Sequence, residues 1–329
     1  QLGKLQGTPR HCDRRHVDPE VKHLTSAVRF DGVSKNFGSR VAVRELSLTI
    51  PEGTIYGFLG PNGAGKTTAM RLMLGIHLPD AGSLSVLGHA DPRRVRERIG
   101  YLPEERGLYP RMQVLEQVAY FGALKGLSDL EARRRAADLL EDYGLGACCK
   151  MRCQALSKGM AQKVQILSTL IHEPDLVILD EPFSGLDPVN RDLMRDVIVG
   201  LRDRGASVIF STHITEQAEQ ICDHVVLIDD GRKLLDGPTD DVRAAAGGAV
   251  YVECVGDLGF LAAMPAVLGV NDTGRQAEVV LAEGGDPQQV LRALVDNGVE
   301  VRAFDLRQPS LHEIFIRSVG RPAEEVDLG

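Results

Sequence analysis

Hydrophobic positions along this chain fall into short apolar runs and longer stretches with helical spacing. Short continuous runs predict buried strands, whereas apolar residues three or four positions apart predict a helix with one buried face. Before position 240, runs of the first kind predict strands at 28–30, 41–43, 46–50, 55–59, 83–88, 99–104, 176–179, 207–211 and 225–228. Helical spacing predicts helices at 69–74, 112–125, 128–143, 158–171, 193–201 and 215–222. Strands and helices that alternate in this way are typical of an α/β fold.

Local signals refine this order. The run at 176–179 has no polar residue in it, which is typical of a parallel strand buried on both faces. The earliest strands instead fit a small antiparallel subdomain, and the helices at about 105–160 fit an insertion between two halves of the core. Ser128 with Glu131 forms a capping box, and Ser157 is a natural N-cap for the helix after it.

The composition changes at 244–248, where three alanines precede two glycines, and we expect a domain boundary there. Beyond it, the pattern predicts a strand at 249–255, a helix at 258–266, strands at 269–272 and 278–282, a helix at 287–297, a strand at 299–305 and a helix at 310–319. This order is close to a β-α-β-β-α-β unit. The predicted organisation is therefore a disordered tail at 1–26, a core at 27–243 and a small α+β regulatory or dimerisation domain at 249–320.

Composition narrows the possible functions. The chain has 329 residues, which suits about two domains, and a formal charge of −8, which argues against a basic nucleic-acid-binding face. No apolar run reaches the roughly eighteen residues that a membrane span needs. Six cysteines are too few for a disulfide scaffold in so long a chain and favour a reducing cytosol. The Cys and His residues at 11–23 and the cysteines at 148, 149 and 153 match no complete zinc pattern, so a disordered tail and reduced thiols are the preferred interpretations.

A glycine-rich loop lies between the predicted strand at 55–59 and the predicted helix at 69–74, and it fits the pattern G-x-x-x-x-G-K-[ST]. Its glycines allow the backbone to curl so that successive N–H groups point at phosphate oxygens. The lysine reaches the β- and γ-phosphates of a nucleotide, and the hydroxyl after it holds Mg²⁺. The loop consists of Gly60, Pro61, Asn62, Gly63, Ala64, Gly65, Lys66, Thr67 and Thr68.

Four further residues stand at positions where they suit nucleotide binding or phosphate chemistry. Asp180 and Glu181 follow the buried strand at 176–179, at the end where open α/β sheets bind ligands. Two such carboxylates also serve as simple helix caps elsewhere, but beside a phosphate loop metal and base roles are favoured. His213 ends another strand, where a core histidine is the alternative. Phe37 lies in a loop upstream of the phosphate loop, where it either stacks on a nucleobase or packs in the core.

Over residues 27–240 the chain resembles the ATP-binding cassette (ABC) ATPase subunits. The loop at 60–68 is similar to the Walker A motif, and 177–181 is similar to Walker B with the adjacent catalytic glutamate. The segment at 156–163 is similar to the LSGGQ signature, 184–187 to the D-loop, and 211–213 to the strand end that carries the switch histidine. Five such motifs in the family's order, with a helical insertion between them, make the resemblance specific.

The resemblance implies a P-loop NTPase core that hydrolyses ATP with Mg²⁺. Lys66, Glu181 and His213 would be catalytic, and Thr67, Asp180 and Glu104 would contact the metal. Ser157 and Gly159, at a helix N-terminus that suits an anion, would contact the nucleotide of a second subunit. The resemblance therefore implies a homodimer, or a heterodimer with another ABC ATPase subunit. It also implies a separate transmembrane permease and a peripheral place on the cytoplasmic face of the inner membrane.

The chain departs from the common family pattern at two places. Lys158 and Met160 stand where the signature usually has Gly and Gln, and Glu104 stands where a Mg²⁺-contacting glutamine is usual. The form of 100–110 is similar to exporter-type ATPases of the sodium- and drug-export group, whose members often end in a segment like 310–315. The predicted function is therefore an ATPase that powers export. The alternatives are an ABC ATPase of DNA repair, chromosomes or translation, and a nucleotide-dependent regulator without a transport partner.

Overall fold

The computed structural model describes residues 26–105, 107–246, 248–282 and 284–319. Its strands are β1 (Ser26–Phe37), β2 (Arg40–Pro51), β3 (Ile55–Leu59), β4 (Ala81–Val86), β5 (Ile99–Leu102), β6 (Leu176–Leu179), β7 (Ser207–Thr212), β8 (His224–Asp229), β9 (Arg232–Pro238), β10 (Ala249–Val255), β11 (Val267–Asp272), β12 (Gln276–Leu281) and β13 (Glu300–Arg307). Its α-helices are α1 (Lys66–Met73), α2 (Val114–Leu124), α3 (Asp129–Asp142), α4 (Lys158–Leu170), α5 (Pro188–Asp203), α6 (Thr215–Ile221), α7 (Thr239–Ala245), α8 (Pro287–Asp296) and α9 (Leu311–Val319). Short 3₁₀ helices are η1 (Pro92–Arg98), η2 (Gly146–Cys148), η3 (Cys153–Ala155) and η4 (Gly259–Ala263).

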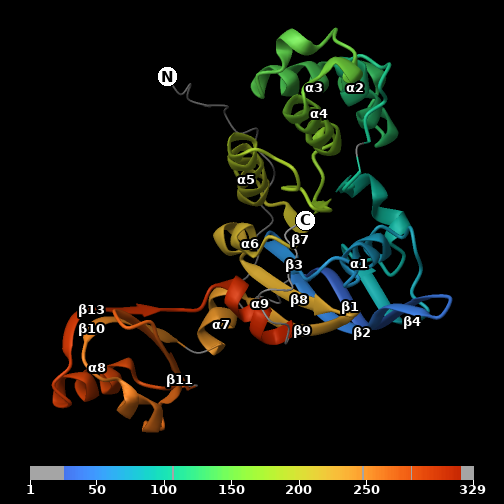
Figure 1. Cartoon of the computed structure of the whole chain (residues 1–329). Coiled ribbons are helices and arrows are strands. Elements are labelled where there is room, and N and C mark those ends of the chain that lie inside the picture. Colours follow the sequence, from blue (N-terminus) through green and yellow to red (C-terminus); the bar gives the residue numbers. More distant parts are fainter. Residues whose placement is uncertain (1–25, 106, 247, 283, 320–329) are drawn as a thin grey trace, which may run out of the picture.

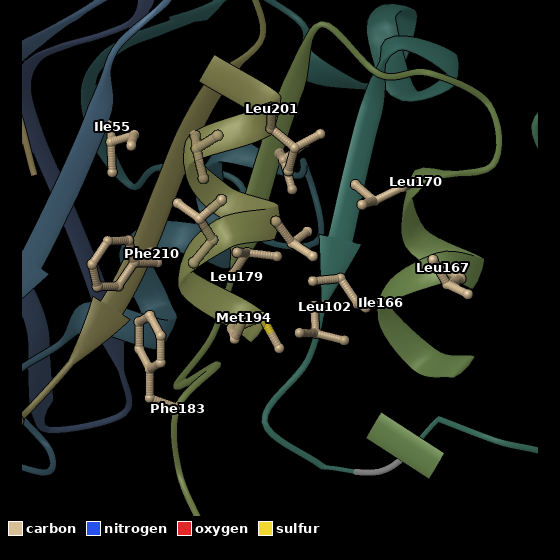
Figure 2. Packing of buried hydrophobic residues seen from close by; sticks show 14 of the residues in the cluster. Ile55, Leu102, Ile166, Leu167, Leu170, Leu179, Phe183, Met194, Leu201 and Phe210 are labelled. Carbon is tan, nitrogen blue, oxygen red and sulfur yellow. The ribbon is translucent and has the colours of Figure 1, made fainter. Parts of the chain in front are cut away.

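The central sheet has the strand order β5-β6-β7-β3-β8-β9, in which the first five strands are parallel and β9 is antiparallel at the edge. The four residues of β6 are fully buried, which confirms the prediction of a strand covered on both faces. One face packs on α4 and α5 in a large apolar cluster, part of which Figure 2 shows around Leu179, Met194 and Phe210. The other face packs on α1 and on the antiparallel strands.

The antiparallel subdomain is a three-stranded sheet with the order β2-β1-β4. Beside it, α2, α3 and α4 form the helical insertion, which projects from the body of the molecule in Figure 1. The Ser128 and Ser157 hydroxyls accept hydrogen bonds from Glu131 N and Met160 N, so both predicted N-caps are confirmed. The predicted α/β core with an antiparallel subdomain and a helical insertion is therefore observed.

The third sheet has the order β11-β12-β10-β13, is fully antiparallel, and lies apart from the central sheet in Figure 1. Its own apolar core includes α8 and η4. The helix predicted at 258–266 is only the 3₁₀ helix η4, because Pro265 holds the preceding Met264 in an extended conformation that ends it. The sequence patterns also missed β9 and α7.

The last helix of the described residues, α9, packs on the central-sheet core although the predicted domain at 249–320 contains it. Leu311, Ile314 and Phe315 belong to the same apolar cluster as the central sheet and α6. The chain thus leaves the central-sheet core at α7, forms the third sheet, and returns to that core with α9. The tail at 1–25, with its Cys and His residues, lies outside the described residues.

Candidate nucleotide-binding site

The glycine-rich loop borders a cavity of about 440 Å³ at one end of the central sheet. This volume lies in the range of small-molecule sites in proteins, about 300–1,000 Å³. Its lining combines the loop with the antiparallel subdomain and the end of β6. The residues are Phe37, Arg40, Ala42, Asn62, Gly63, Ala64, Gly65, Lys66, Thr67, Thr68, Glu104 and Glu181.

The loop conformation requires glycine at two of its positions. Gly60 and Gly65 have φ of 154° and 105°, which side-chain-bearing residues rarely adopt. A Cβ at Gly60 would lie 2.1 Å from the Ile228 carbonyl oxygen, and a Cβ at Gly65 would lie 2.3 Å from that of Ala42. Both contacts are with backbone and have no room to relax. The glycines therefore let the loop lie against β8 and β2 while α1 begins at Lys66.

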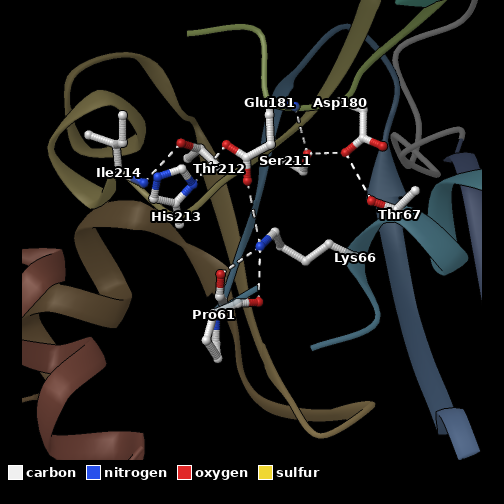
Figure 3. A network of polar contacts seen from close by, with 10 residues as sticks. Pro61, Lys66, Thr67, Asp180, Glu181, Ser211, Thr212, His213 and Ile214 are labelled. Atoms are coloured by element: carbon white, nitrogen blue, oxygen red, sulfur yellow. Dashed lines mark hydrogen bonds and ion pairs between the residues drawn. The ribbon is translucent and has the colours of Figure 1, made fainter. Parts of the chain in front are cut away.

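Lys66 is the buried cation of this cavity, only 6% exposed, whereas Arg40 in the same lining is exposed. Its Nζ donates to the Gly60 and Pro61 carbonyl oxygens at 2.6 and 3.2 Å and lies 3.6 Å from Glu181 Oε1 (Figure 3). Burial lowers the pKa of Lys66, and the neighbouring Glu181 carboxylate opposes that shift. A buried ammonium held by two loop carbonyls is a cation positioned to accept an incoming anion.

Asp180 is held at the end of β6 by two hydroxyls. The Ser211 hydroxyl donates to Asp180 Oδ1 at 2.6 Å, and the Thr67 hydroxyl donates to the same oxygen at 3.2 Å. Ser211 Oγ also accepts from Glu181 N at 2.9 Å. Ser211 is fully buried in β7 and therefore fixes both carboxylate residues of the neighbouring strand. The sequence patterns identified Ser211 only as part of a motif, without this bridging contact.

Glu181 is constrained by its backbone and by His213. Its φ of 48° lies in the left-handed region, which is uncommon for a residue other than glycine. Its Oε2 lies 3.0 Å from His213 Nδ1 (Figure 3). Its Oε1 is buried and forms the ion pair with Lys66 at 3.6 Å, but it has no hydrogen-bond partner in the described part of the chain. Backbone strain and an unsatisfied buried oxygen are typical of a functional carboxylate.

Comparison with known proteins shows which family the chain resembles. The family model described as "ABC transporter" matches residues 43–184, and the model "ATP-binding protein DrrA1-3-like, C-terminal domain" matches residues 237–319. An uncharacterized ABC transporter ATP-binding protein of Bacillus subtilis, YhaQ, is 38% identical over 291 residues, which are 88% of this chain and 97% of that protein. The chain belongs to the ATP-binding proteins of ABC transporters.

Relatives with named roles have similar coverage. The daunorubicin/doxorubicin resistance ATP-binding protein DrrA of Streptomyces peucetius is 34% identical over 312 residues, 92% of this chain and 94% of that protein. The Nod factor export ATP-binding protein I of Cupriavidus pinatubonensis is 35% identical over 324 residues, 96% of this chain and 99% of that protein. A solved ATP-binding subunit of an ABC transporter superposes with a TM-score of 0.61 at 31% identity and covers 66% of this chain and 92% of its own.

The donor set of this ABC ATPase fits a magnesium ion bound together with phosphate. The Thr67 hydroxyl and the Asp180 carboxylate already meet, and Glu104 lines the same cavity. Mg²⁺ prefers oxygen ligands and uses one or two carboxylates plus substrate phosphates and water. Consistent with so few protein ligands, no group of three or more His, Cys, Asp or Glu residues arranged for a metal occurs in the described ranges. Cys148, Cys149 and Cys153 are free cysteines.

Other predicted residues lie at the margins of the cavity. Phe37 is 45% exposed at its mouth and contacts the His77 ring edge-on, with centroids 5.1 Å apart. Arg40, which the sequence patterns missed, lies beside it and donates to the Gly63 carbonyl oxygen at 3.1 Å. No local signal distinguishes Arg40, because only the packing of the β1–β2 turn against the loop brings it there.

The signature residues of α4 lie elsewhere. Ser157 and Gly159 are absent from the lining of this cavity, and Gly159 packs against Asn190 at the start of α5. Lys158 reaches the D-loop, where a Cβ at Gly185 would lie 2.5 Å from the Lys158 Nζ. Lys158 and Glu104 both border a second cavity of about 180 Å³ behind Asp180 and Glu181. The two departures from the family pattern, one cationic and one anionic, thus face the same space.

Proposed function

We propose that this chain is the ATP-binding and ATP-hydrolysing subunit of an ABC transporter that powers export through a separate membrane permease. The observation that carries the proposal is the connected polar network of Thr67, Asp180, Ser211, Glu181 and His213 beside Lys66, at the wall of a nucleotide-sized cavity. The relatives named for drug resistance and Nod factor export support the export direction. These relatives favour transport over the alternative of DNA repair, chromosome or translation work.

The geometry supports a separate role in ATP hydrolysis for each residue of the site. Lys66 would exchange its two loop carbonyls for β- and γ-phosphate oxygens, and the loop amides at the start of α1 would hold the same phosphates. Thr67 and Asp180 would hold Mg²⁺, with Glu104 as a further oxygen ligand. The bound Mg²⁺ would neutralise phosphate charge. Glu181 would orient the attacking water through its unsatisfied Oε1, while His213 holds Oε2. Phe37 would pack on the base at the cavity mouth.

The absence of Ser157 and Gly159 from the cavity lining supports an active dimer. The N-terminal amides of α4 carry a partial positive charge that favours an anion. A second copy, or another ABC ATPase subunit, would present this terminus to the nucleotide bound at Lys66. A two-fold arrangement would close two such sites at once. We therefore propose that ATP binding joins the two subunits and hydrolysis releases them.

A separate permease is proposed because the relatives are named as ATP-binding proteins of ABC transporters and export systems. Among the described helices, none is both long and apolar enough to cross a bilayer. The helical insertion exposes apolar side chains beside the Glu104 loop, with Tyr109, Tyr120 and Leu124 at 50%, 39% and 60% exposure. Grouped exposed apolar residues suit a protein contact. The permease would bind this surface, which places the chain on the cytoplasmic face of the membrane as a peripheral subunit.

Replacement of Glu181 by Gln tests the proposal. The amide keeps the shape of the side chain but removes its negative charge, so ATP turnover should fall by about 100-fold or more. Mg²⁺-ATP should still bind and should trap a dimer, measured by equilibrium binding and size-exclusion chromatography. Glu253→Gln, on an exposed position of β10, is the matched control and should turn over ATP like the wild type. Equal turnover in the two variants would exclude Glu181 as the catalytic carboxylate.

A further inference from the structure

The last helix of the chain packs beside the helix that follows the switch histidine. Leu311, Ile314 and Phe315 of α9 are 2%, 5% and 8% exposed and belong to the apolar cluster of the ATPase core. Their neighbour is α6, which Figure 1 shows next to α9 at the side of the central sheet. The C-terminal segment therefore contributes buried surface to the catalytic domain after the third sheet is complete.

A polar cluster fixes α9 to two helices of the core. Glu219 of α6 accepts from the Leu311 backbone N at 2.9 Å through Oε2 and lies 3.3 Å from an Arg243 guanidinium nitrogen through Oε1. Arg243 of α7 in turn donates from Nε to the Pro309 carbonyl oxygen at 3.1 Å. The Glu219 and Arg243 side chains are only 23% and 24% exposed, so these charge-assisted contacts are partly shielded from water. We call Glu219, Arg243, Pro309 and Leu311 the C-terminal latch.

Glu219, one residue of the latch, lies close to His213 along the chain. β7 ends at Thr212 and α6 begins at Thr215, so His213 occupies the short link between them. The Thr215 hydroxyl lies 3.4 Å from His312 Nδ1 of α9, which adds a contact at the first residue of α6. His213 itself has one polar side-chain contact within the described residues, the one to Glu181. His213 therefore lies between β7 and the first residue of α6, which α9 contacts.

We propose that the C-terminal latch positions His213 on Glu181 and so sets the rate of ATP hydrolysis. Glu219 is then a positioning residue, which acts through α6 without touching the nucleotide. When the latch opens, α6 gains freedom and the His213–Glu181 geometry is occupied less often. The third sheet lies between α7 and α9 in the chain, so the latch closes the segment that contains it. This inference rests on the catalytic roles proposed above for Glu181 and His213.

Replacement of Glu219 by Ala in the full chain tests the latch, with Glu216→Ala as the matched control. Both residues lie on α6 and both substitutions remove one negative charge, but Glu216 is exposed and makes none of the latch contacts. We expect Glu219→Ala to lower kcat about fivefold, with the KM for ATP and the thermal midpoint close to those of the control. Each rate is divided by the concentration of ATP-binding sites, so that kcat is given per site. A purely structural role would instead lower the midpoint and the number of binding sites without changing kcat per site.

Arg243→Ala is an independent test, because it removes the latch contacts that come from α7. The loss in Glu219→Ala/Arg243→Ala should equal the larger single loss, since contacting residues of one network are not additive. The latch would be overturned if both single variants kept the wild-type kcat. It would also be overturned if the fold-loss of kcat in the double variant equalled the product of the two single losses. Failure of the catalytic assignment is distinguishable, because Glu181→Gln would then hydrolyse ATP like the wild type.

Discussion

The central sheet and the third sheet differ in where their strands end. In the central sheet, parallel strands bring their carboxyl ends to one edge, where Gly60, Asp180 and His213 follow β3, β6 and β7. The third sheet is antiparallel, so successive strands end at opposite edges and no such convergence occurs. A site built from several strand ends therefore belongs to the parallel sheet.

Buried charge differs between the two sheets in the same way. Lys66, Asp180 and Glu181 are 6%, 2% and 8% exposed. Within residues 248–282 and 284–319, no charged side chain is buried. Charges of the third sheet form exposed pairs instead, such as Arg307 with Asp305 at 62% and 58% exposure. Burial of a charge is costly unless it is paired, so the buried charges mark where chemistry takes place.

The largest expected effect compares the same substitution in the two sheets. Asp180→Asn removes the negative charge to which the Thr67 and Ser211 hydroxyls donate. Mg²⁺-dependent ATP turnover should therefore fall by at least about 100-fold. Asp305→Asn breaks only an exposed ion pair and should change the free energy of unfolding by less than about 0.5 kcal/mol. Steady-state ATPase assays measure turnover in both variants, and urea unfolding measures their free energy of unfolding. Comparable turnover in the two variants would remove the functional distinction between the sheets.

The next largest effect is a loss of stability, and it distinguishes the contribution of α9 from that of the third sheet. A chain that ends at Ala245 loses three buried apolar side chains from the core, Leu311, Ile314 and Phe315. The free energy of unfolding should fall by about 5 kcal/mol, at roughly 1.5–3 kcal/mol for each side chain. Urea unfolding of the truncated chain against the full chain measures this loss.

The control for this truncation removes the third sheet but keeps α9. Residues 247–308 are replaced by a Gly/Ser linker of about six residues, because the Arg243 side chain already reaches the Pro309 carbonyl oxygen, with Nε and O 3.1 Å apart. This variant should keep the stability of the core and bind ATP. If it is as unstable as the truncated chain, the third sheet itself stabilises the ATPase domain.

The smallest effect concerns acid stability. Burial lowers the pKa of His172 to about 4, and its Nε2 lies 3.2 Å from the Ile99 carbonyl oxygen. The unfolded chain takes up this proton below about pH 6.5, whereas the folded chain does so only near pH 4, so stability decreases as the pH falls through this window. His172→Gln keeps a donor for Ile99 and should flatten the decrease in urea midpoint between pH 7 and 5. His89→Gln, at an exposed position, should leave it unchanged, and an equal effect of both would refute the assignment.

Local patterns predicted most elements because their causes lie within a few residues. The unbroken apolar run of β6 and the serine caps at 128 and 157 are of this kind. β9 was missed because Arg232, Lys233 and Asp236 make it polar, and it is a strand only through its pairing with β8. An edge strand with charged side chains carries little apolar periodicity.

For the site, the sequence by itself determined which residues stand beside one another in the chain. The glycine pattern specifies a loop of unusual φ, and the order Asp180-Glu181 at a buried strand specifies two carboxylates at one strand end. Tertiary structure decided the contacts between distant segments. Strand pairing places Ser211 where it contacts the Asp180 carboxylate and the Glu181 backbone N, and the β1–β2 turn brings in Arg40. The docking of α9 beside α6 was also decided at this level, because its apolar face fits the ATPase core while the third sheet already has a core of its own.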